Sequence, residues 1–254
     1  METAMNKNRE EIIFIVIPCY NEARRMPAEE IISFMERNPS VLLCLVDDCS
    51  TDSTGAILQS VKDHFPGRVI IETHQRNKGK AEAVRTGVLS SFSRLKFSHI
   101  GYFDADLSTP LDECFHLMSS LESKETLEFS FGSRLAIVGS VIERKLYRHL
   151  FGRIIATIIS NILGIRVYDT QCGAKIFTSH LAEKVFAEPF ISTWLFDVEI
   201  FARIIRMTGR ENVESIMIET PLMTWADKGG SKIEMTYSFK VFYDLFRIRR
   251  KYFH

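Results

Sequence analysis

Four short apolar segments that alternate with helical patterns constrain the fold of the first half of this chain more than any other feature. They cover residues 12–17, 41–46, 69–71 and the run that ends at Phe103. Continuous apolar runs rich in β-branched residues are typical of strands that are buried on both faces of a parallel sheet. Helical patterns follow at 28–37, 57–65 and 80–92, and a further helix start follows the fourth strand. The sequence therefore predicts an α/β fold with a mostly parallel central sheet flanked by helices.

Polar side chains follow these predicted strands at the points where the strands end. Tyr20 and Glu22 follow the first strand, and Asp48 follows the second. Open α/β sheets bind ligands at the carboxyl ends of their strands. The two carboxylates are suited to accept hydrogen bonds from a base or a ribose, and Tyr20 to stack or hydrogen-bond beside them. Capping of the turns is the alternative explanation.

The fourth strand ends in two carboxylates, Asp104 and Asp106, which are separated by Ala105. Side chains at positions i and i+2 of an extended segment point the same way. The pair therefore presents hard oxygen ligands of the kind that Mg²⁺ or Mn²⁺ binds, with phosphate oxygens completing the shell. We interpret the pair as a metal and diphosphate site. An acidic turn that caps the next helix is the alternative.

The composition narrows the class of protein. Lys plus Arg and Asp plus Glu each number 32 in 254 residues, and this balance argues against a general nucleic-acid binder. The five cysteines are odd in number and lack C-x-x-C spacing, which favours buried thiols in a reducing compartment. The longest apolar stretch, 154–165, contains three polar residues and is shorter than the roughly 18 residues of a membrane span. We expect a cytoplasmic chain that does not cross a bilayer by itself.

The common nucleotide fingerprints do not occur in the sequence. A dinucleotide-binding enzyme would carry G-x-G-x-x-G after the first strand, and a P-loop NTPase would carry G-x-x-x-x-G-K-[ST]. A nucleotide bound through carboxylates and a metal fits the pattern better.

Four segments that occur in order resemble the signature segments of family-2 glycosyltransferases of the GT-A fold. They are Val-Ile-Pro-Cys-Tyr-Asn-Glu at 16–22, Val-Asp-Asp-Cys-Ser-Thr-Asp at 46–52, Asn-Lys-Gly-Lys at 77–80 and Asp-Ala-Asp at 104–106. Segments 132–134, 169–175, 194–199 and 230–232 are similar to the polyprenyl-phosphate branch of that family, and most of all to dolichyl-phosphate β-glucosyltransferases. The resemblance covers nearly the whole chain. It departs in two places: eukaryotic relatives usually carry an amino-terminal membrane anchor where this sequence is polar, and Ser108 stands where many mannosyl-type relatives place a Gln.

This resemblance implies an inverting transfer of a hexose, glucose or mannose, from a nucleotide diphosphate sugar of the UDP-glucose or GDP-mannose type to a polyprenyl phosphate. It also implies Mg²⁺ or Mn²⁺ bound by Asp104 and Asp106, where the metal would neutralise charge on the departing diphosphate. The donor-binding positions would be Pro18, Tyr20, Glu22, Asp48, Lys78, Lys80, Asp104, Ala105, Asp106 and Lys232. Lys78 and Lys80 are equally explained as solvated residues at a helix start, and 227–232 as a Gly-Gly turn.

The second half of the chain should bind the acceptor. Arg134 follows a fifth predicted strand at 129–132, where a guanidinium can bind a phosphate through two parallel hydrogen bonds; a plain surface arginine is the alternative. Arg144, near the start of an amphipathic helix predicted over 143–162, and Gln171 complete the candidate acceptor set. Core packing is the alternative explanation of that helix's apolar stripe.

Asp169, in a polar loop, and Asp197, close to Glu199 in an apolar context, are the candidates for a catalytic base. Burying such carboxylates without partners would be costly, so they should face a site or a cation. A hydroxyl acceptor would need a base, whereas a phosphate acceptor, with its second pKa of ~6, is already ionised at neutral pH. The sequence assigns Asp169 to acceptor positioning or to the base, and Asp197 is its rival.

Residues 236–254 predict an amphipathic terminal helix on which Phe239, Phe242, Tyr243 and Phe246 share a face beside several cations. The pattern fits a membrane interface, or else a helix docked on the core. We expect one domain over 1–254, with a nucleotide-sugar half (10–125), an acceptor half (126–235) and this helix, peripherally associated with the inner face of a membrane. Three alternatives stay open: a glycosyltransferase of the same fold that acts on a saccharide hydroxyl, a nucleotidyltransferase, and a non-catalytic membrane-associated partner.

Overall fold

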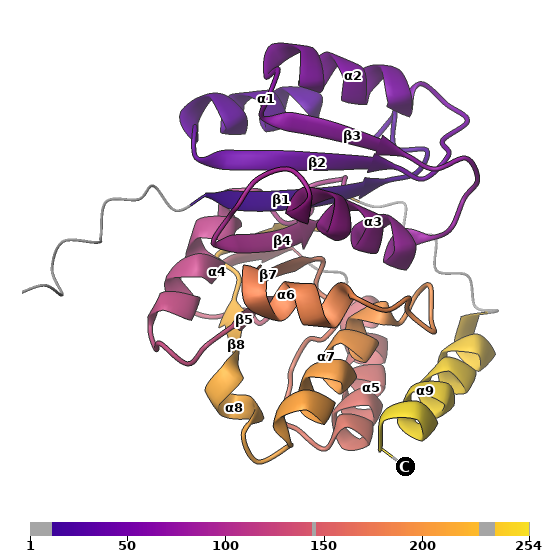
Figure 1. The fold of residues 1–254 in the computed structure, drawn as a ribbon. Helices are drawn as coiled ribbons and strands as arrows, with labels where there is room; N and C mark the ends of the chain where they lie inside the picture. The colour runs from indigo at the N-terminus through magenta and orange to yellow at the C-terminus, as the bar shows by residue number, and fades with distance from the viewer. Residues whose placement is uncertain (1–11, 144–145, 229–236, 254) are drawn as a thin grey trace, which may run out of the picture.

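A seven-stranded sheet with the strand order β3-β2-β1-β4-β7-β5-β8 forms the centre of the protein (Figure 1). The computed structural model describes residues 12–143, 146–228 and 237–253. Neighbouring strands of the main sheet are parallel except at β7, which runs antiparallel to both β4 and β5. β6 and β9 form a separate parallel pair. The predicted mostly parallel central sheet is confirmed.

The strands are β1 (Ile13–Cys19), β2 (Val41–Asp47), β3 (Val69–Thr73), β4 (His99–Phe103), β5 (Phe129–Ser133), β6 (Val141–Glu143), β7 (Ala174–Thr178), β8 (Met217–Pro221) and β9 (Thr224–Ala226). The helices are α1 (Ala28–Arg37), α2 (Thr54–His64), α3 (Lys80–Phe92), α4 (Glu113–Glu122), α5 (Leu146–Leu163), α6 (Ser179–Phe186), α7 (Phe196–Thr208), α8 (Val213–Ile216) and α9 (Tyr237–Phe253).

Strand residues alternate between the two faces of the sheet, and a different set of helices covers each face. Phe14 and Val16 of β1 lie in a cluster with apolar residues of α3, α5, α6, α7 and α9. Ile13, Ile15 and Ile17 lie in a second cluster with residues of α1, α2 and α4. The central strands are thus buried on both sides, which explains why β1 and β2 are continuous apolar runs.

The alternation of strands and helices predicted for the first half of the chain is confirmed, since β1 to β4 and the helices after them occupy the expected segments. All five cysteines are free thiols, as expected, and four of them are buried. Among the described residues, no helix has the length and apolar character that a bilayer crossing requires.

The helix expected over 143–162 was placed wrongly at its start. It begins at Leu146, and Val141–Glu143 form β6 instead. These residues pair with Thr224–Ala226 of β9, so pairing with a distant strand overrides the local helical pattern. Further along α5, Ile155 and Ile158 pack against the first core cluster, so core packing accounts for that part of the stripe.

Candidate active site

One edge of the sheet carries the carboxyl ends of β1, β2, β4 and β5. Because β7 is antiparallel, the loop that precedes it, 168–173, lies at the same edge beside the residues that follow β4 and β5. The Asp104 amide donates to the Gly173 carbonyl at 3.2 Å, and the Arg134 amide donates to the Asp169 carboxylate at 3.2 Å. Residues predicted for the donor and for the acceptor therefore meet at this edge.

Asp48 is buried, and its carboxylate organises the segment that carries Lys78 and Lys80. The backbone amides of Lys78 and Gly79 donate to it at 2.8 and 2.7 Å. A ring nitrogen of His74 lies 2.6 Å from Asp48 Oδ1. Gly79 has a φ of 88°, a conformation that favours glycine and that turns the chain into α3. Asp48 therefore positions the segment that carries Lys78 and Lys80.

Two cations face the acidic pair after β4. Lys80 Nζ lies 2.5 Å from Asp104 Oδ1. Arg25 lies 3.6 Å from Asp106 and donates to both carboxylate oxygens of Glu22, at 2.9 and 2.7 Å. Burial lowers the pKa of Lys80, but the neighbouring carboxylates, Asp104 first among them, raise it above its ordinary value, so the ammonium stays charged. Sequence reasoning missed Arg25, whose only local signal is its spacing of three residues from Glu22.

The acidic pair suits Mg²⁺ or Mn²⁺. The side chains of Asp104 and Asp106 are 39% and 16% exposed, so solvent reaches both, and carboxylates are hard oxygen ligands. Within the described ranges, no group of three or more His, Cys, Asp or Glu side chains is placed to bind an ion. An ion at Asp104 and Asp106 would therefore take further oxygens from the diphosphate of a donor, as Mg²⁺ does in phosphate-transferring proteins.

Arg134 and Asp169 form a bidentate ion pair on the other side of the edge. Arg134 Nε and Nη2 donate to the two carboxylate oxygens at 2.6 and 2.9 Å. Glu219 fixes the start of the loop, because its carboxylate accepts the amides of Tyr168 and Asp169 at 2.9 and 2.8 Å. Burial alone would raise the pKa of Asp169, but the charge and hydrogen bonds of Arg134 outweigh it and lower the pKa to about 2. Asp169 is therefore a weak proton acceptor, which fits the positioning of Arg134.

Three buried polar atoms next to this pair have no hydrogen-bond partner among the described residues. They are Ser133 Oγ, Thr170 Oγ1 and Gln171 Nε2. Buried polar groups are nearly always hydrogen-bonded, so three such atoms in adjacent segments indicate a place where a polar ligand completes the bonding. Gln171 is a sequence-based candidate. Ser133 and Thr170 were missed, because a lone serine or threonine beside a loop is usually a turn residue.

Asp197 lies in the first turn of α7 and pairs with a lysine of the sheet. Lys175, which is fully buried, donates from Nζ to Asp197 Oδ1 at 2.6 Å. The Tyr102 hydroxyl donates to the same oxygen. Burial and the charge of Asp197 raise the pKa of Tyr102, so the phenol stays protonated. The expectation that this carboxylate faces a cation is confirmed.

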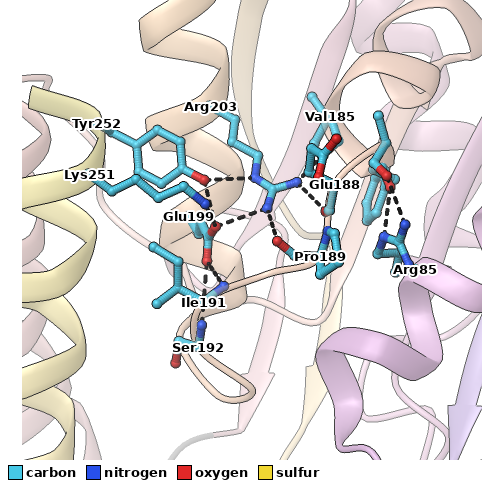
Figure 2. A network of polar contacts seen from close by, with 12 residues as sticks. Arg85, Val185, Glu188, Pro189, Ile191, Ser192, Glu199, Arg203, Lys251 and Tyr252 are labelled. Carbon is cyan, nitrogen blue, oxygen red and sulfur yellow. Dashed lines mark hydrogen bonds and ion pairs between the residues drawn. The ribbon is translucent and has the colours of Figure 1, made fainter.

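Glu199 also faces a cation, in a network that joins α7 to α9 (Figure 2). Arg203 Nη2 donates to Glu199 at 2.9 Å, and the Tyr252 hydroxyl donates at 2.6 Å. The Ile191 amide donates to the second carboxylate oxygen at 2.7 Å. Arg203 further donates to three carbonyls of the segment 185–189. Glu199 therefore fixes the contact between these elements.

The terminal helix α9 docks on the core and exposes aromatic side chains at the same time. Leu245 and Ile248 are buried against the first core cluster. Phe242, Tyr243 and Phe246 are 50%, 62% and 61% exposed. The explanation that this helix docks on the core is confirmed, and contact of its exposed aromatic side chains with a membrane stays a prediction.

Of the remaining candidate site residues, three lie at the sheet edge and two lie outside the described residues. Pro18 is half-buried at the end of β1, Tyr20 is exposed just beyond it, and Ala105 is buried between the two aspartates. Arg144 and Lys232 lie outside the described residues.

Comparisons with known proteins agree with this geometry. The sequence pattern of the family described as glycosyl transferase family 2 matches residues 14–186. The chain is 31% identical to a dolichyl-phosphate β-glucosyltransferase of Saccharomyces cerevisiae, over 97% of this chain and 77% of the relative. It is 29% identical to the Homo sapiens protein of the same name, over 94% of this chain and 75% of the relative.

A solved structure with the same fold is found at lower sequence identity. Glucosyl-3-phosphoglycerate synthase from Mycobacterium tuberculosis, solved in complex with Mn²⁺, UDP and glucosyl-3-phosphoglycerate, superposes with a TM-score of 0.69 at 16% identity. The match covers 94% of this chain and 80% of that one. It confirms the GT-A arrangement of the sheet and its helices. The family match runs from β1 to the end of α6 and covers more than half of the chain, so the chain belongs to glycosyl transferase family 2.

Proposed function

We propose that this protein transfers a hexose, with inversion, from a nucleoside diphosphate sugar to a polyprenyl phosphate at a membrane surface. The observation that carries the proposal is Arg134, positioned by buried Asp169 at the edge that also bears Asp104 and Asp106. The name shared by the sequence relatives favours glucose as the hexose and a long-chain polyprenyl phosphate as the acceptor. The Mn²⁺ and UDP bound by the structural neighbour favour a UDP-sugar and a divalent ion.

The charges of the site favour a phosphate acceptor over a hydroxyl acceptor. A hydroxyl needs a general base whose pKa lies near the working pH. The pKa of Asp169 is lowered to about 2, and Asp197 is engaged by Lys175 and Tyr102. A phosphate monoester with a second pKa of ~6 is ionised without help. Its negative charge must approach the donor diphosphate, and Arg134 supplies a cation that lowers the repulsion.

The donor side supports a single displacement. Asp104 and Asp106 would hold Mg²⁺ or Mn²⁺, which when bound neutralises charge on the departing diphosphate. Lys80, 2.5 Å from Asp104, adds a cation beside that position. An acceptor phosphate oxygen attacks the anomeric carbon as the nucleoside diphosphate leaves from the opposite face, so the configuration inverts. The step requires no proton transfer, which fits the engagement of Asp169 by Arg134 and of Asp197 by Lys175 and Tyr102.

The exposed face of α9 supports peripheral association with a membrane. Aromatic side chains beside cations are typical of helices that lie in the interface of a bilayer. Phe242 and Phe246 are exposed, and so are Arg249 and Arg250 further along the helix. A polyprenyl chain resides in the bilayer, so an enzyme that uses its phosphate must work at that surface. We assign α9 to this contact, on the cytoplasmic leaflet.

A panel of donors and acceptors tests the proposed function. Purified protein with Mn²⁺ is given radiolabelled UDP-glucose, GDP-mannose and related donors, together with polyprenyl phosphate or the matched uncharged polyprenol. We expect labelled lipid from UDP-glucose with the phosphate only. Similar transfer to the alcohol, or transfer to soluble saccharides, would refute the lipid-phosphate acceptor. Failure to use any donor would favour a non-catalytic partner.

Arg134→Ala separates the acceptor side from the donor side. Loss of charge-assisted contacts worth about 1.5 to 4 kcal/mol should lower transfer to polyprenyl phosphate by ~10- to 1000-fold. Slow hydrolysis of the donor by water should change little. Arg134→Lys should recover only part, because an ammonium lacks the planar fork. Arg37→Ala is the matched control, since it removes an exposed arginine that pairs with Asp112 at 3.4 Å. Equal loss of transfer and hydrolysis would place Arg134 on the donor side.

A further inference from the structure

We propose that Lys175 is a positioning residue that sets the spacing between the donor and acceptor sides of the site. The inference rests on the proposed function, because it assigns Asp104 to the donor and Arg134 to the acceptor. Lys175 touches neither side directly. It acts through the loop 169–173, which contacts both.

The loop is fixed to the donor side at Gly173. The Asp104 amide donates to the Gly173 carbonyl at 3.2 Å. A Cβ atom on Gly173 would lie 2.0 Å from Asp104 Oδ2, so the backbone of the loop packs directly against this carboxylate. Only glycine permits so close an approach. Any shift of Cys172 and Gly173 therefore moves the surface on which Asp104 rests.

The same loop is fixed to the acceptor side at its other end. Asp169 binds Arg134 through both carboxylate oxygens, and the Gln171 amide donates back to Asp169 at 3.1 Å. Only three residues, 170–172, therefore lie between the contact with Arg134 and the contact with Asp104. The conformation of this short segment determines how far apart the two sides lie.

Lys175 binds the segment 169–173 at Cys172. Its Nζ donates to the Cys172 carbonyl at 2.6 Å and to Asp197 Oδ1 at 2.6 Å. The Tyr102 hydroxyl donates to the same carboxylate. Cys172 is thereby tied through Lys175 to the first turn of α7, whose N-terminus favours the negative charge of Asp197. The loop is thereby connected to α7, which lies in the same core cluster as the strand neighbours of Lys175.

The strand neighbours of Lys175 are buried aromatic side chains, so an apolar residue at this position would pack in the core equally well. Its register partners are Tyr102 on β4 and Phe131 on β5, both buried, and Phe177 follows it on the same face of β7. Burying an ion pair loses hydration that the mutual attraction often fails to recover, and apolar replacements of similar volume are frequently as stable. What an apolar side chain cannot supply is the hydrogen bond to Cys172. We assign the lysine to that bond.

The test removes the ion pair without leaving an unpaired charge. In Lys175→Met with Asp197→Leu both charges are lost, so the variant should fold with a Tm close to that of the wild type. We expect amide hydrogen exchange in 169–174 to become at least ~10-fold faster. We expect kcat for lipid-linked sugar to fall ~100-fold with acceptor KM within ~3-fold, because a misplacement of about 1 Å carries a penalty of that size.

Two further variants separate positioning from stability. Tyr102→Phe removes another hydrogen bond of the same cluster but keeps the bond to Cys172, so loop exchange and kcat should stay within ~3-fold of the wild type. Asp197→Asn leaves Lys175 an oxygen to bind, so the loop should stay protected and kcat should fall by no more than ~10-fold. Asp197→Asn leaves the charge of Lys175 without a carboxylate partner, so Tyr102→Phe, which keeps both charges, is the variant that keeps the test decisive if the double variant does not fold.

Each outcome decides the inference. Unchanged loop exchange in the double variant, or transfer within ~3-fold of the wild type, would overturn it. Near-complete loss of kcat in Asp197→Asn with a protected loop would also overturn it, because Asp197 would then be the base. The exchange measurement needs no acceptor, so it tests Lys175 even if the wild type forms no lipid-linked sugar. That last result would refute the proposed function instead.

Discussion

Asp169→Asn tests the interpretation of the ion pair between Asp169 and Arg134. The substitution keeps the size of the side chain and one acceptor oxygen, but it removes the charge. The pKa of Asp169 falls from its ordinary 3.8 to about 2 in the folded protein. At 1.36 kcal/mol for each tenfold change in proton affinity, this difference corresponds to about 2 to 3 kcal/mol of stability. For a domain of this size, losing it lowers Tm by about 5 to 10 °C.

The dependence on pH identifies the source of that stability. Because the pKa is lowered by folding, the stabilisation is complete above about pH 4 and is lost as the pH falls through about 2. The Tm difference between the wild type and Asp169→Asn should therefore be full near pH 7 and smaller near pH 3. Scanning calorimetry at both values measures it. An equal difference at both, or none near pH 7, would refute the reasoning.

The same variant distinguishes a positioning role from a base. Without its orienting partner Arg134 loses part of its alignment, and transfer should fall ~10- to 100-fold with the shape of the pH profile unchanged. The acid limb of that profile should come from the acceptor phosphate, whose second pKa is ~6. It should therefore move when a thiophosphate of lower pKa replaces the phosphate. A loss beyond ~10⁴-fold, with the acid limb abolished, would identify Asp169 as the base.

Three further changes test other parts of the site. Asp106→Asn should abolish transfer and leave the Tm near that of the wild type, and chelator should do the same to the wild type; full activity in excess chelator would contradict the metal site. Gly173→Ala, whose new Cβ would lie 2.0 Å from a carboxylate oxygen, should weaken Mn²⁺-dependent UDP binding by at least ~10-fold, whereas Gly55→Ala, with its nearest neighbour at 3.5 Å, should not. Phe242→Ser should reduce sedimentation with anionic vesicles, and salt should weaken wild-type binding, while Phe115→Ser on a different helix serves as the control; binding that is insensitive to both would argue against α9.

The positions of the residues on the proposed donor side were predictable from sequence because their signals are local. A strand buried on both faces is an apolar run, and the polar residues that follow it must lie at the edge of the sheet. Asp104 and Asp106 could therefore be placed without knowledge of the tertiary structure. The connection of Asp48 to the segment before α3 could not, since it joins residues thirty positions apart through backbone amides.

The acceptor side depends on a strand whose position has no local signal. The sequence around Ala174–Thr178 does not reveal that β7 inserts between β4 and β5 in the opposite direction. The pairings of Arg134 with Asp169 and of Lys175 with Asp197 follow from that insertion. The misplaced helix start near Glu143 has a similar origin, because β6 exists only through its pairing with β9.

The place of β7 in the sheet also determines the order in which the protein can assemble. β1 to β4 are consecutive strands of the sheet, in the order β3-β2-β1-β4, and come early in the chain. They can therefore pair while later residues are still being synthesised. β5 follows, yet it joins them only when β7 arrives to bridge β4 and β5. Until then β4 presents an unpaired edge, which is a template for association with other chains. A chain arrested before Ala174 would therefore be prone to aggregation, and transfer activity would begin only with the step that closes the sheet.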